Sequence, residues 1–219
     1  MKWIFKWLLR LFILAVVLIV IFLLSYNSIL RVLIEHNIRK QTGMDAEIGR
    51  FHLGLVEPTI EIQNLKIFNP PDFGGTLFLD IPEIHVEYDR DALAHREIHL
   101  TLLRLNLGEL NIVKNSLGRT NIFALGVQLP SKKHGIKTES NLKKETGLDF
   151  KQIDVLNVSV GTTKYIDLQN PKNDRAQNIG IENCIMKNVK SENDLAGLMV
   201  LVVLRGGDFF GSLVLPQKN

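Results

Sequence analysis

The chain has 219 residues, of which 26 are Lys or Arg and 23 are Asp or Glu. Residues 1–30 hold three of the bases and no acid, so residues 31–219 carry 23 charges of each sign. A neutral domain lacks the concentrated basic face that nucleic-acid binding needs, which excludes nucleic acid as a partner. The single cysteine, Cys184, excludes an intramolecular disulfide, and we expect it to be a small buried apolar side chain.

Residues 11–30 contain no charged side chain and consist mostly of Leu, Ile, Val and Phe. As a helix rising about 1.5 Å per residue, this segment reaches about 30 Å, the thickness of the hydrocarbon core of a bilayer. Trp3 and Trp7 before it, and Tyr26 near its end, are the aromatic side chains expected at the two membrane interfaces. The pattern predicts a transmembrane helix over residues 11–30.

A cleaved signal peptide and a buried core helix are the alternatives for this segment. A signal peptide has an apolar run of about 7–15 residues and then small residues at its cleavage site. Here the run is longer, and Leu23, Leu24 and Tyr26 occupy that place. A core helix would have a polar face, which residues 11–24 lack. We therefore favour an uncleaved anchor.

The orientation follows from Lys2, Lys6 and Arg10, which precede the predicted span. The positive-inside rule places residues 1–10 in the cytoplasm. The residues just beyond the span are also net basic, so the charge bias is moderate. We expect a single-pass protein of a bacterial inner membrane, with residues 44–219 in the periplasm.

Residues 31–43 are predicted to form a juxtamembrane amphipathic helix. Val32, Leu33 and Ile38 fall roughly on one side of it, with charged residues elsewhere. Gly43 is a typical C-terminal stop, so a new structural unit is expected to begin at residue 44.

After Gly43 the apolar periodicity changes from near 3.6 to 2, the period of half-buried strands. Turn sequences rich in Pro and Gly separate the alternating segments, and little helical pattern lies between them, which favours an antiparallel sheet. The sequence thus predicts a mainly β domain, in which a curved antiparallel sheet forms a groove with a few flanking helices. The alternating apolar positions are Ile60 and Ile62; Ile84, Val86 and Tyr88; Ile98, Leu100 and Leu102; Val158 and Val160; and Ile179 and Ile181.

Several of these segments change face midway, the one that begins at Ile98 among them. Leu100 and Leu102 share one parity, whereas Leu103 and Leu105 share the other. Such a switch requires a β-bulge or a change in which face is covered. Either is compatible with a strongly curved sheet.

Two segments of the domain lack the strand pattern. Residues 130–147 are rich in lysine without periodicity, and we predict a mobile, solvated basic loop; contact with anionic lipid is the alternative. Residues 191–204 begin with Ser191 as N-cap and Asp194 at the third helical position, and then become apolar on every side. They are too short to span a bilayer. We predict a helix that caps the apolar face of the sheet, with a buried helix or strand as the alternatives.

The sequence contains no G-x-S-x-G, Walker-type or H-E-x-x-H motif, so we expect neither an enzyme nor a cofactor. His85, His95 and His99 are weak candidates for metal ligands, because each shares a predicted strand face with glutamates and a hairpin would bring them together. The simpler interpretation is that they occupy the water-facing positions of strands.

The apolar face of the predicted sheet is the remaining candidate site. If the sheet is open, a helix, a second chain or acyl chains must cover this face, and burial of hydrocarbon there is favourable by about 0.8 kcal/mol for each methylene. A β core covered by the chain itself is the alternative. The candidate groove residues are Ile84, Val86, Tyr88, Ile98, Leu100 and Leu102.

Several short motifs occur in order between Met1 and Ile122. They follow the predicted membrane helix and are Thr42-Gly43, Glu47-Ile48-Gly49-Arg50, Asn69-Pro70-Pro71-Asp72-Phe73, Ile81-Pro82-Glu83-Ile84 and Asn115-Ser116-Leu117-Gly118-Arg119-Thr120-Asn121-Ile122. Together and in this order they resemble the AsmA-like family of bacterial envelope proteins.

The resemblance implies an inner-membrane protein with a periplasmic β-groove, similar to bridge-like lipid transfer proteins that pass phospholipid toward the outer membrane. It brings no catalytic residues. We therefore expect a protein that binds or passes phospholipid acyl chains and supports envelope biogenesis. The alternative is a tethered scaffold or assembly factor that binds a protein partner, or a second copy of the chain, at a sheet edge.

Overall fold

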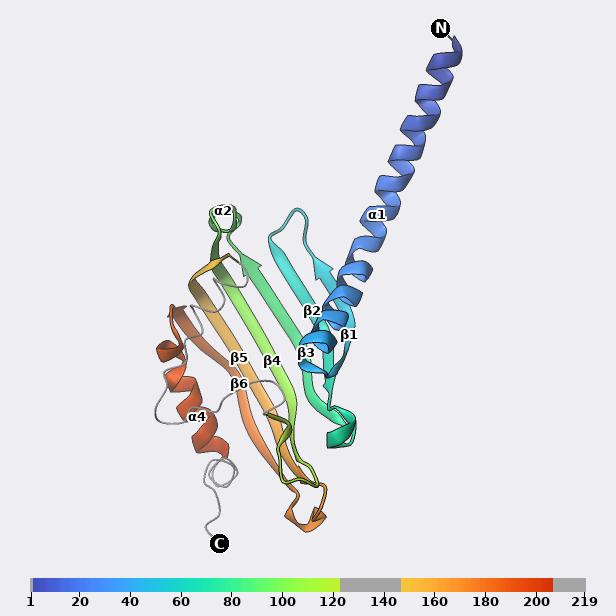
Figure 1. Ribbon diagram of the computed structural model, residues 1–219. Coiled ribbons are helices and arrows are strands. Elements are labelled where there is room, and N and C mark those ends of the chain that lie inside the picture. The colour runs from blue at the N-terminus through green and yellow to red at the C-terminus, as the bar shows by residue number, and fades with distance from the viewer. Residues whose placement is uncertain (1, 123–146, 207–219) are drawn as a thin grey trace.

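The computed structural model describes residues 2–122 and 147–206. They form a long N-terminal helix and a mainly β domain with one six-stranded sheet, whose strands lie side by side in chain order (Figure 1). The elements are α1 (Lys2–Thr42), β1 (Asp45–Leu53), β2 (Thr59–Phe68), η1 (Pro71–Phe73), β3 (Leu77–Tyr88), α2 (Arg90–Ala94), β4 (Glu97–Lys114), β5 (Asp149–Asp167), η3 (Pro171–Asn173), β6 (Arg175–Val189), η4 (Glu192–Leu195) and α4 (Ala196–Gly206).

The sheet is mixed, and the prediction of a wholly antiparallel sheet is wrong. β4 and β5 run parallel, with Glu97 beside Asp149 and Lys114 beside Asp167, whereas the other neighbouring strands are antiparallel. A parallel crossover needs a dozen or more residues. The chain between Lys114 and Asp149 is much longer than this, so it can return to the starting end of β4.

α1 is continuous, so the predicted span and juxtamembrane helix are parts of one helix. It ends at Thr42 as predicted. Gly43 adopts a φ of 70° and donates its N–H to the carbonyl oxygen of Arg39 at 2.9 Å, a left-handed stop that favours glycine. Among the residues available for such a test, no helix combines the length and apolarity needed to cross a membrane.

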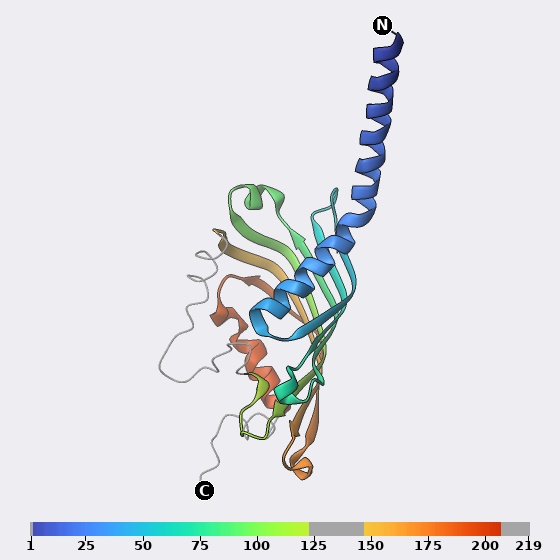
Figure 2. The ribbon, with the colours of Figure 1, turned by 45° about the vertical axis from the view of Figure 1, so that its right-hand side comes forward.

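The C-terminal half of α1 lies along β1 (Figure 2). Glu35 Oε1 accepts a hydrogen bond from the Ile48 N–H at 2.8 Å, and Asn27 Oδ1 accepts one from the Leu53 N–H at 3.0 Å. Later residues of β1 therefore contact earlier residues of α1. The strand and the helix run antiparallel.

The predicted change of face in β4 is confirmed. Glu87 of β3 lies opposite Leu102 of β4, but the next residue, Tyr88, lies opposite Leu100. Thr101 is thus an extra residue in β4, as in a β-bulge. The alternation of side chains between the two faces of the sheet is interrupted there, so Leu100 and Leu102 point to opposite faces.

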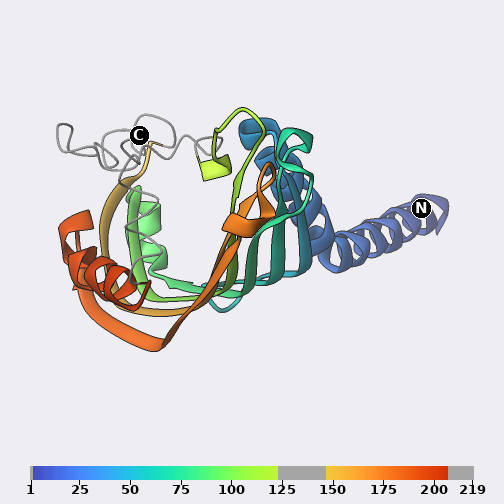
Figure 3. The ribbon, with the colours of Figure 1, turned by 90° about the horizontal axis from the view of Figure 1, so that it is seen from below.

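Helices cover the two ends of one face of the sheet. Leu30 and Ile34 of α1 pack against the cluster on β1–β3, and Leu198 and Leu201 of α4 pack against the cluster on β5 and β6. Leu107 of β4 packs with both clusters, so α1 and α4 lie on the same face, at opposite ends of the arc that the sheet makes (Figure 3). The buried members are Ile48, Phe51, Leu65 and Ile81 in the first cluster, and Ile153, Leu156, Val158, Val160, Ile179, Ile181 and Val189 in the second.

The capping helix predicted over residues 191–204 is present as η4 followed by α4. Ser191 and Asp194 form the expected capping box, in which the Asp194 carboxylate accepts the Ser191 N–H at 2.8 Å. Cys184 is only partly buried, against the cluster that α4 covers. The basic segment 130–147, apart from Gly147, lies outside the described residues.

Candidate functional site

An apolar pocket lies at the end of the sheet where α2 connects β3 to β4. Its volume is about 370 Å³, which is within the range of small-molecule sites. Aliphatic and aromatic side chains from β1, β2, β3, β4 and α2 form most of the wall, and two carboxylates and one histidine complete it. The lining residues are Leu53, Ile60, Val86, Tyr88, Asp89, Leu93, Glu97, Ile98, His99 and Leu100.

Four of the six predicted groove residues line this pocket: Val86 and Tyr88 from β3, and Ile98 and Leu100 from β4. They meet because the hairpin through α2 places the end of β3 beside the start of β4. The fifth, Ile84, packs farther along β3 with the cluster that α1 covers.

The sixth predicted groove residue, Leu102, lies on the other face. It is paired with Glu87, the strand neighbour of Val86, and neighbouring residues of a strand point to opposite faces. The prediction that Leu102 shares a face with Leu100 is wrong, because the alternation does not continue through the extra residue Thr101.

The pocket wall is accessible. Val86, Tyr88, Ile98 and Leu100 are half-buried, in contrast to the buried clusters at the two ends of the sheet. In the described part of the chain α1 packs on β1 and α4 packs on β6, and the apolar face of β3 and β4 lies between them. This middle part of the face can accept an apolar ligand.

Asp89 organises the edge of the pocket by capping α2. Its Oδ1 accepts hydrogen bonds from the N–H groups of Asp91 at 2.8 Å and Ala92 at 3.1 Å, the usual role of an N-cap aspartate. These backbone donors, that of Ala92 above all, and the His99 ring hold the pKa of Asp89 below its usual range. The carboxylate is therefore charged near neutral pH.

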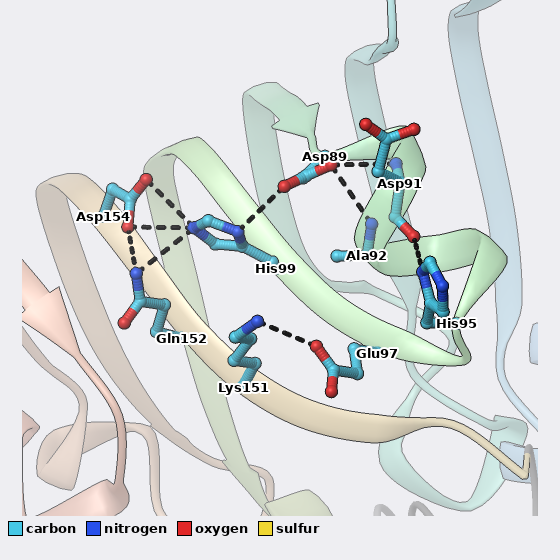
Figure 4. Close-up of polar contacts among 9 residues, drawn as sticks. All are labelled: Asp89, Asp91, Ala92, His95, Glu97, His99, Lys151, Gln152 and Asp154. Carbon is cyan, nitrogen blue, oxygen red and sulfur yellow. Dashed lines mark hydrogen bonds and ion pairs between the residues drawn. The ribbon is translucent and has the colours of Figure 1, made fainter.

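His99 lies between two carboxylates, on the β4 side of the pocket (Figure 4). Its Nδ1 lies 3.3 Å from Asp89 Oδ2, and its Nε2 lies 3.0 Å from both carboxylate oxygens of Asp154 on β5. Gln152 also contacts Asp154, at 2.6 Å. This cluster ties β4 and β5 to the start of α2.

The three histidines considered as metal ligands do not converge. His85 contacts Glu61 through Nδ1 and Glu87 through Nε2, each at 3.2 Å, so its carboxylates occupy opposite sides of one ring, as at His99. The prediction that His95 lies on a strand is wrong, because His95 is the C-cap of α2. In residues 2–122 and 147–206, no three His, Cys, Asp or Glu residues are placed to hold a metal ion together.

The carboxylates and the histidine of the pocket lining already have partners. Glu97 pairs with Lys151 at 2.8 Å, and Asp89 and His99 contact each other (Figure 4). Apart from the Tyr88 hydroxyl, the remaining wall is hydrocarbon and offers dispersion contacts and hydrophobic burial. The arrangement therefore suits hydrocarbon better than a polar ligand.

Comparison of this chain with protein-family models, curated proteins and solved structures finds no match.

Among the apolar residues of the lining, Ile60 was predicted as an alternating strand position but not as a groove residue, and Leu53 and Leu93 were not predicted at all. Leu53 ends β1, and Leu93 lies in the short helix α2, so neither belongs to an alternating run at the pocket. Their contribution depends on how the β1–β2 turn and α2 fold over the strand ends. The alternation pattern carries no signal for this.

The opposite end of the sheet contains a buried amide network that joins two of the sequence motifs. Asn121 Nδ2 donates to Asn69 Oδ1 at 2.7 Å and to the Asn111 carbonyl oxygen at 2.8 Å, and Asn121 Oδ1 accepts the Val113 N–H at 3.0 Å. Asn69 and Asn121 are both buried. These motif residues have a structural role at the end of the sheet away from the pocket.

Proposed function

We propose that this protein is a membrane-anchored lipid-binding protein, which holds an acyl chain of a phospholipid in the pocket between β3 and β4. The observation that carries the proposal is the accessible apolar pocket on a sheet face whose two ends are covered by α1 and α4. Burial of hydrocarbon there is favourable by about 0.8 kcal/mol for each methylene.

We also propose that residues 11–30 of α1 anchor the chain in the inner membrane, with residues 1–10 in the cytoplasm and the sheet in the periplasm. The uncharged sequence and the flanking Trp3, Trp7 and Tyr26 support this proposal. The course of the chain is compatible with it, because α1 continues without a break from this segment to the helix that packs on β1. Such a protein would act in envelope biogenesis, in line with its resemblance to the AsmA-like family.

A tethered scaffold that binds a partner protein by strand addition is the second candidate. β1 and β6 are the two edge strands of the sheet among the described residues; α1 packs on β1, whereas Ile185 on β6 is exposed. However, the register of β6 against β5 shifts twice, and Asn183 and Asn188 have positive φ values of 49° and 56°. Irregularity of this kind protects a sheet edge from pairing. The lipid proposal is therefore preferred.

Photocrosslinking tests the proposal. The full chain is reconstituted in vesicles that contain phosphatidylethanolamine with a diazirine in its acyl chain, and the crosslinked peptides are mapped by mass spectrometry. We expect crosslinks at β3 and β4, close to Val86 and Leu100. Crosslinks confined to residues 11–30 would contradict the pocket, and capture of one protein without lipid would favour the scaffold.

A matched pair of variants sharpens this test. Leu100→Trp fills the pocket, whereas Leu102→Trp places the same side chain on the opposite face, two residues along β4. Replacing about two methylenes of bound lipid corresponds to a loss of about tenfold in occupancy. We expect this loss of crosslinking in Leu100→Trp and none in Leu102→Trp. Equal crosslinking in the two variants would contradict the assignment.

A further inference from the structure

The turn between β1 and β2 exposes two adjacent apolar side chains. Val56 is 87% exposed and Leu55 is 56% exposed, and Leu93 on α2 is 43% exposed at the same end of the sheet (Figure 1). We call Leu55, Val56 and Leu93 the apolar rim. Adjacent exposed apolar side chains of this kind mark an interaction site more often than single ones do.

The contacts between α1 and β1 set the height of this rim along α1. Successive residues of β1 contact positions that lie progressively nearer the N-terminus of α1. The contacts are Asp45 with Arg39, Ile48 with Glu35 and Leu53 with Asn27. The rim begins two residues beyond Leu53. At about 3.3 Å per strand residue and 1.5 Å per helix residue, it lies about one helical turn N-terminal to Asn27. It is therefore level with about residue 23 of the uncharged segment 11–30, one turn inside Tyr26, the aromatic side chain proposed for the outer membrane interface.

The rim is also the edge of the pocket. Arg90 Nη2 donates hydrogen bonds to the carbonyl oxygens of Leu55 at 2.9 Å and Val56 at 2.5 Å, which tie the start of α2 to the turn. Leu93 of the rim and Leu53 next to it both line the pocket. Any surface that contacts the apolar rim would therefore lie next to the pocket.

We infer that the apolar rim inserts into the bilayer interface beside α1, so that the pocket opens toward the membrane from which it takes its lipid. The inference rests on the proposed membrane anchor and names the surface that meets the pocket. The occupant of the rim is a lipid surface, because a helix that leaves the bilayer at Tyr26 carries Leu55 and Val56, about one turn farther along it, to the depth of the interface.

Charge does not drive this insertion. Near the rim, Arg90 and Arg96 are balanced by Glu57 and Asp91. A balanced rim gains little from anionic lipid, since that attraction depends on clustered basic side chains. We therefore expect the same insertion into bilayers of zwitterionic phosphatidylcholine alone.

Fluorescence quenching by lipid tests the inference. The full chain with Cys184→Ser receives a single cysteine by Val56→Cys, is labelled with an environment-sensitive dye, and is reconstituted in phosphatidylcholine vesicles that carry nitroxide-labelled acyl chains. The matched control is Leu117→Cys. Leu117 is 72% exposed and follows β4 at the other end of the sheet, about 55 Å away by the rise of an 18-residue strand.

We expect the dye at residue 56 to be quenched severalfold more than the dye at residue 117, with a blue-shifted emission. Equal quenching at the two positions would overturn the inference. Lipid crosslinking to β3 and β4 in the same samples separates it from the proposed function. Quenching at residue 56 without such crosslinks supports the inserted rim and contradicts the lipid pocket, whereas crosslinks without quenching contradict the rim alone.

Discussion

The Tyr26 hydroxyl donates a hydrogen bond to the carbonyl oxygen of Leu53, at the last residue of β1. Asn27 accepts the N–H of the same residue, so two consecutive side chains of α1 hold both backbone polar groups of Leu53. Leu53 in turn lines the pocket. The pocket is therefore fixed to one level of the helix that we propose to enter the membrane.

Replacing Asn27 by Ala is expected to loosen the end of β1. The Leu53 N–H loses its acceptor, which costs about 1 kcal/mol of local stability. We expect amide hydrogen exchange at Leu53 to become several times faster, while exchange in β3 and β4 stays unchanged. Gln41→Ala is the control, because the exposed Gln41 side chain donates a hydrogen bond to Asn37 Oδ1 on α1 itself and does not hold β1 in the described part of the chain. Equal effects of the two substitutions would contradict the proposed docking contact.

The cap formed by α4 predicts a contrast between two leucines of the same helix. Leu201 packs against the cluster on β5 and β6, whereas Leu204 is 73% exposed. Truncation of a buried leucine costs about 2–5 kcal/mol. Because Leu201 is half-buried, we expect Leu201→Ala to lower the free energy of unfolding by about 2 kcal/mol. Leu204→Ala should leave it nearly unchanged. Urea unfolding measures both, and similar values would show that α4 does not stabilise the sheet.

The periodicity of the sequence predicted the local elements well, for a physical reason. A period of 2 is required wherever one face of a strand is buried, and a change of phase requires an extra residue. The change between Leu102 and Leu103 therefore identifies an irregular segment, and the extra residue in the structure is Thr101. The pattern did not say on which side of the extra residue the pocket lies, so Leu102 was assigned to the wrong face.

Relationships between distant segments were not predictable in the same way. The parallel pairing of β4 with β5 depends on where the chain after Lys114 returns, and side-chain alternation is the same in parallel and antiparallel strands. Similarly, Asn69 and Asn121 each resemble ordinary turn residues in the sequence. Only in the folded chain does Asn121 Nδ2 lie 2.7 Å from Asn69 Oδ1.

The amide network predicts a large effect of Asn121→Ala. Asn121 is fully buried, and its removal leaves the Val113 N–H, Asn69 Oδ1 and the Asn111 carbonyl oxygen each without a partner from that side chain. An unsatisfied buried polar group costs about 1–3 kcal/mol. We expect a loss of about 3 kcal/mol or more in the free energy of unfolding.

Asn193→Ala is the matched control for this network, since Asn193 is an exposed residue of η4. It should change the free energy of unfolding by less than about 0.5 kcal/mol. A mild effect of Asn121→Ala, close to that of the control, would mean that water replaces the amide and that the network contributes little.

The N-cap of α2 predicts a dependence of stability on pH. The pKa of Asp89 is lowered in the folded state by the N–H groups of Ala92 and Asp91 and by His99, so its carboxylate stabilises the fold above the unfolded-state pKa. This contribution is lost as the pH falls through the folded-state pKa, which lies below the ordinary aspartate value of 3.8. Asp89→Asn keeps a side-chain oxygen that can cap α2 but removes the charge. We therefore expect the parent chain to be more stable than Asp89→Asn near pH 7, and the difference in the free energy of unfolding to close as the pH is lowered past 3.8.

Urea unfolding of both chains between neutral and acidic pH measures this difference in the free energy of unfolding. A constant difference over the whole range would show that the charge of Asp89 does not contribute.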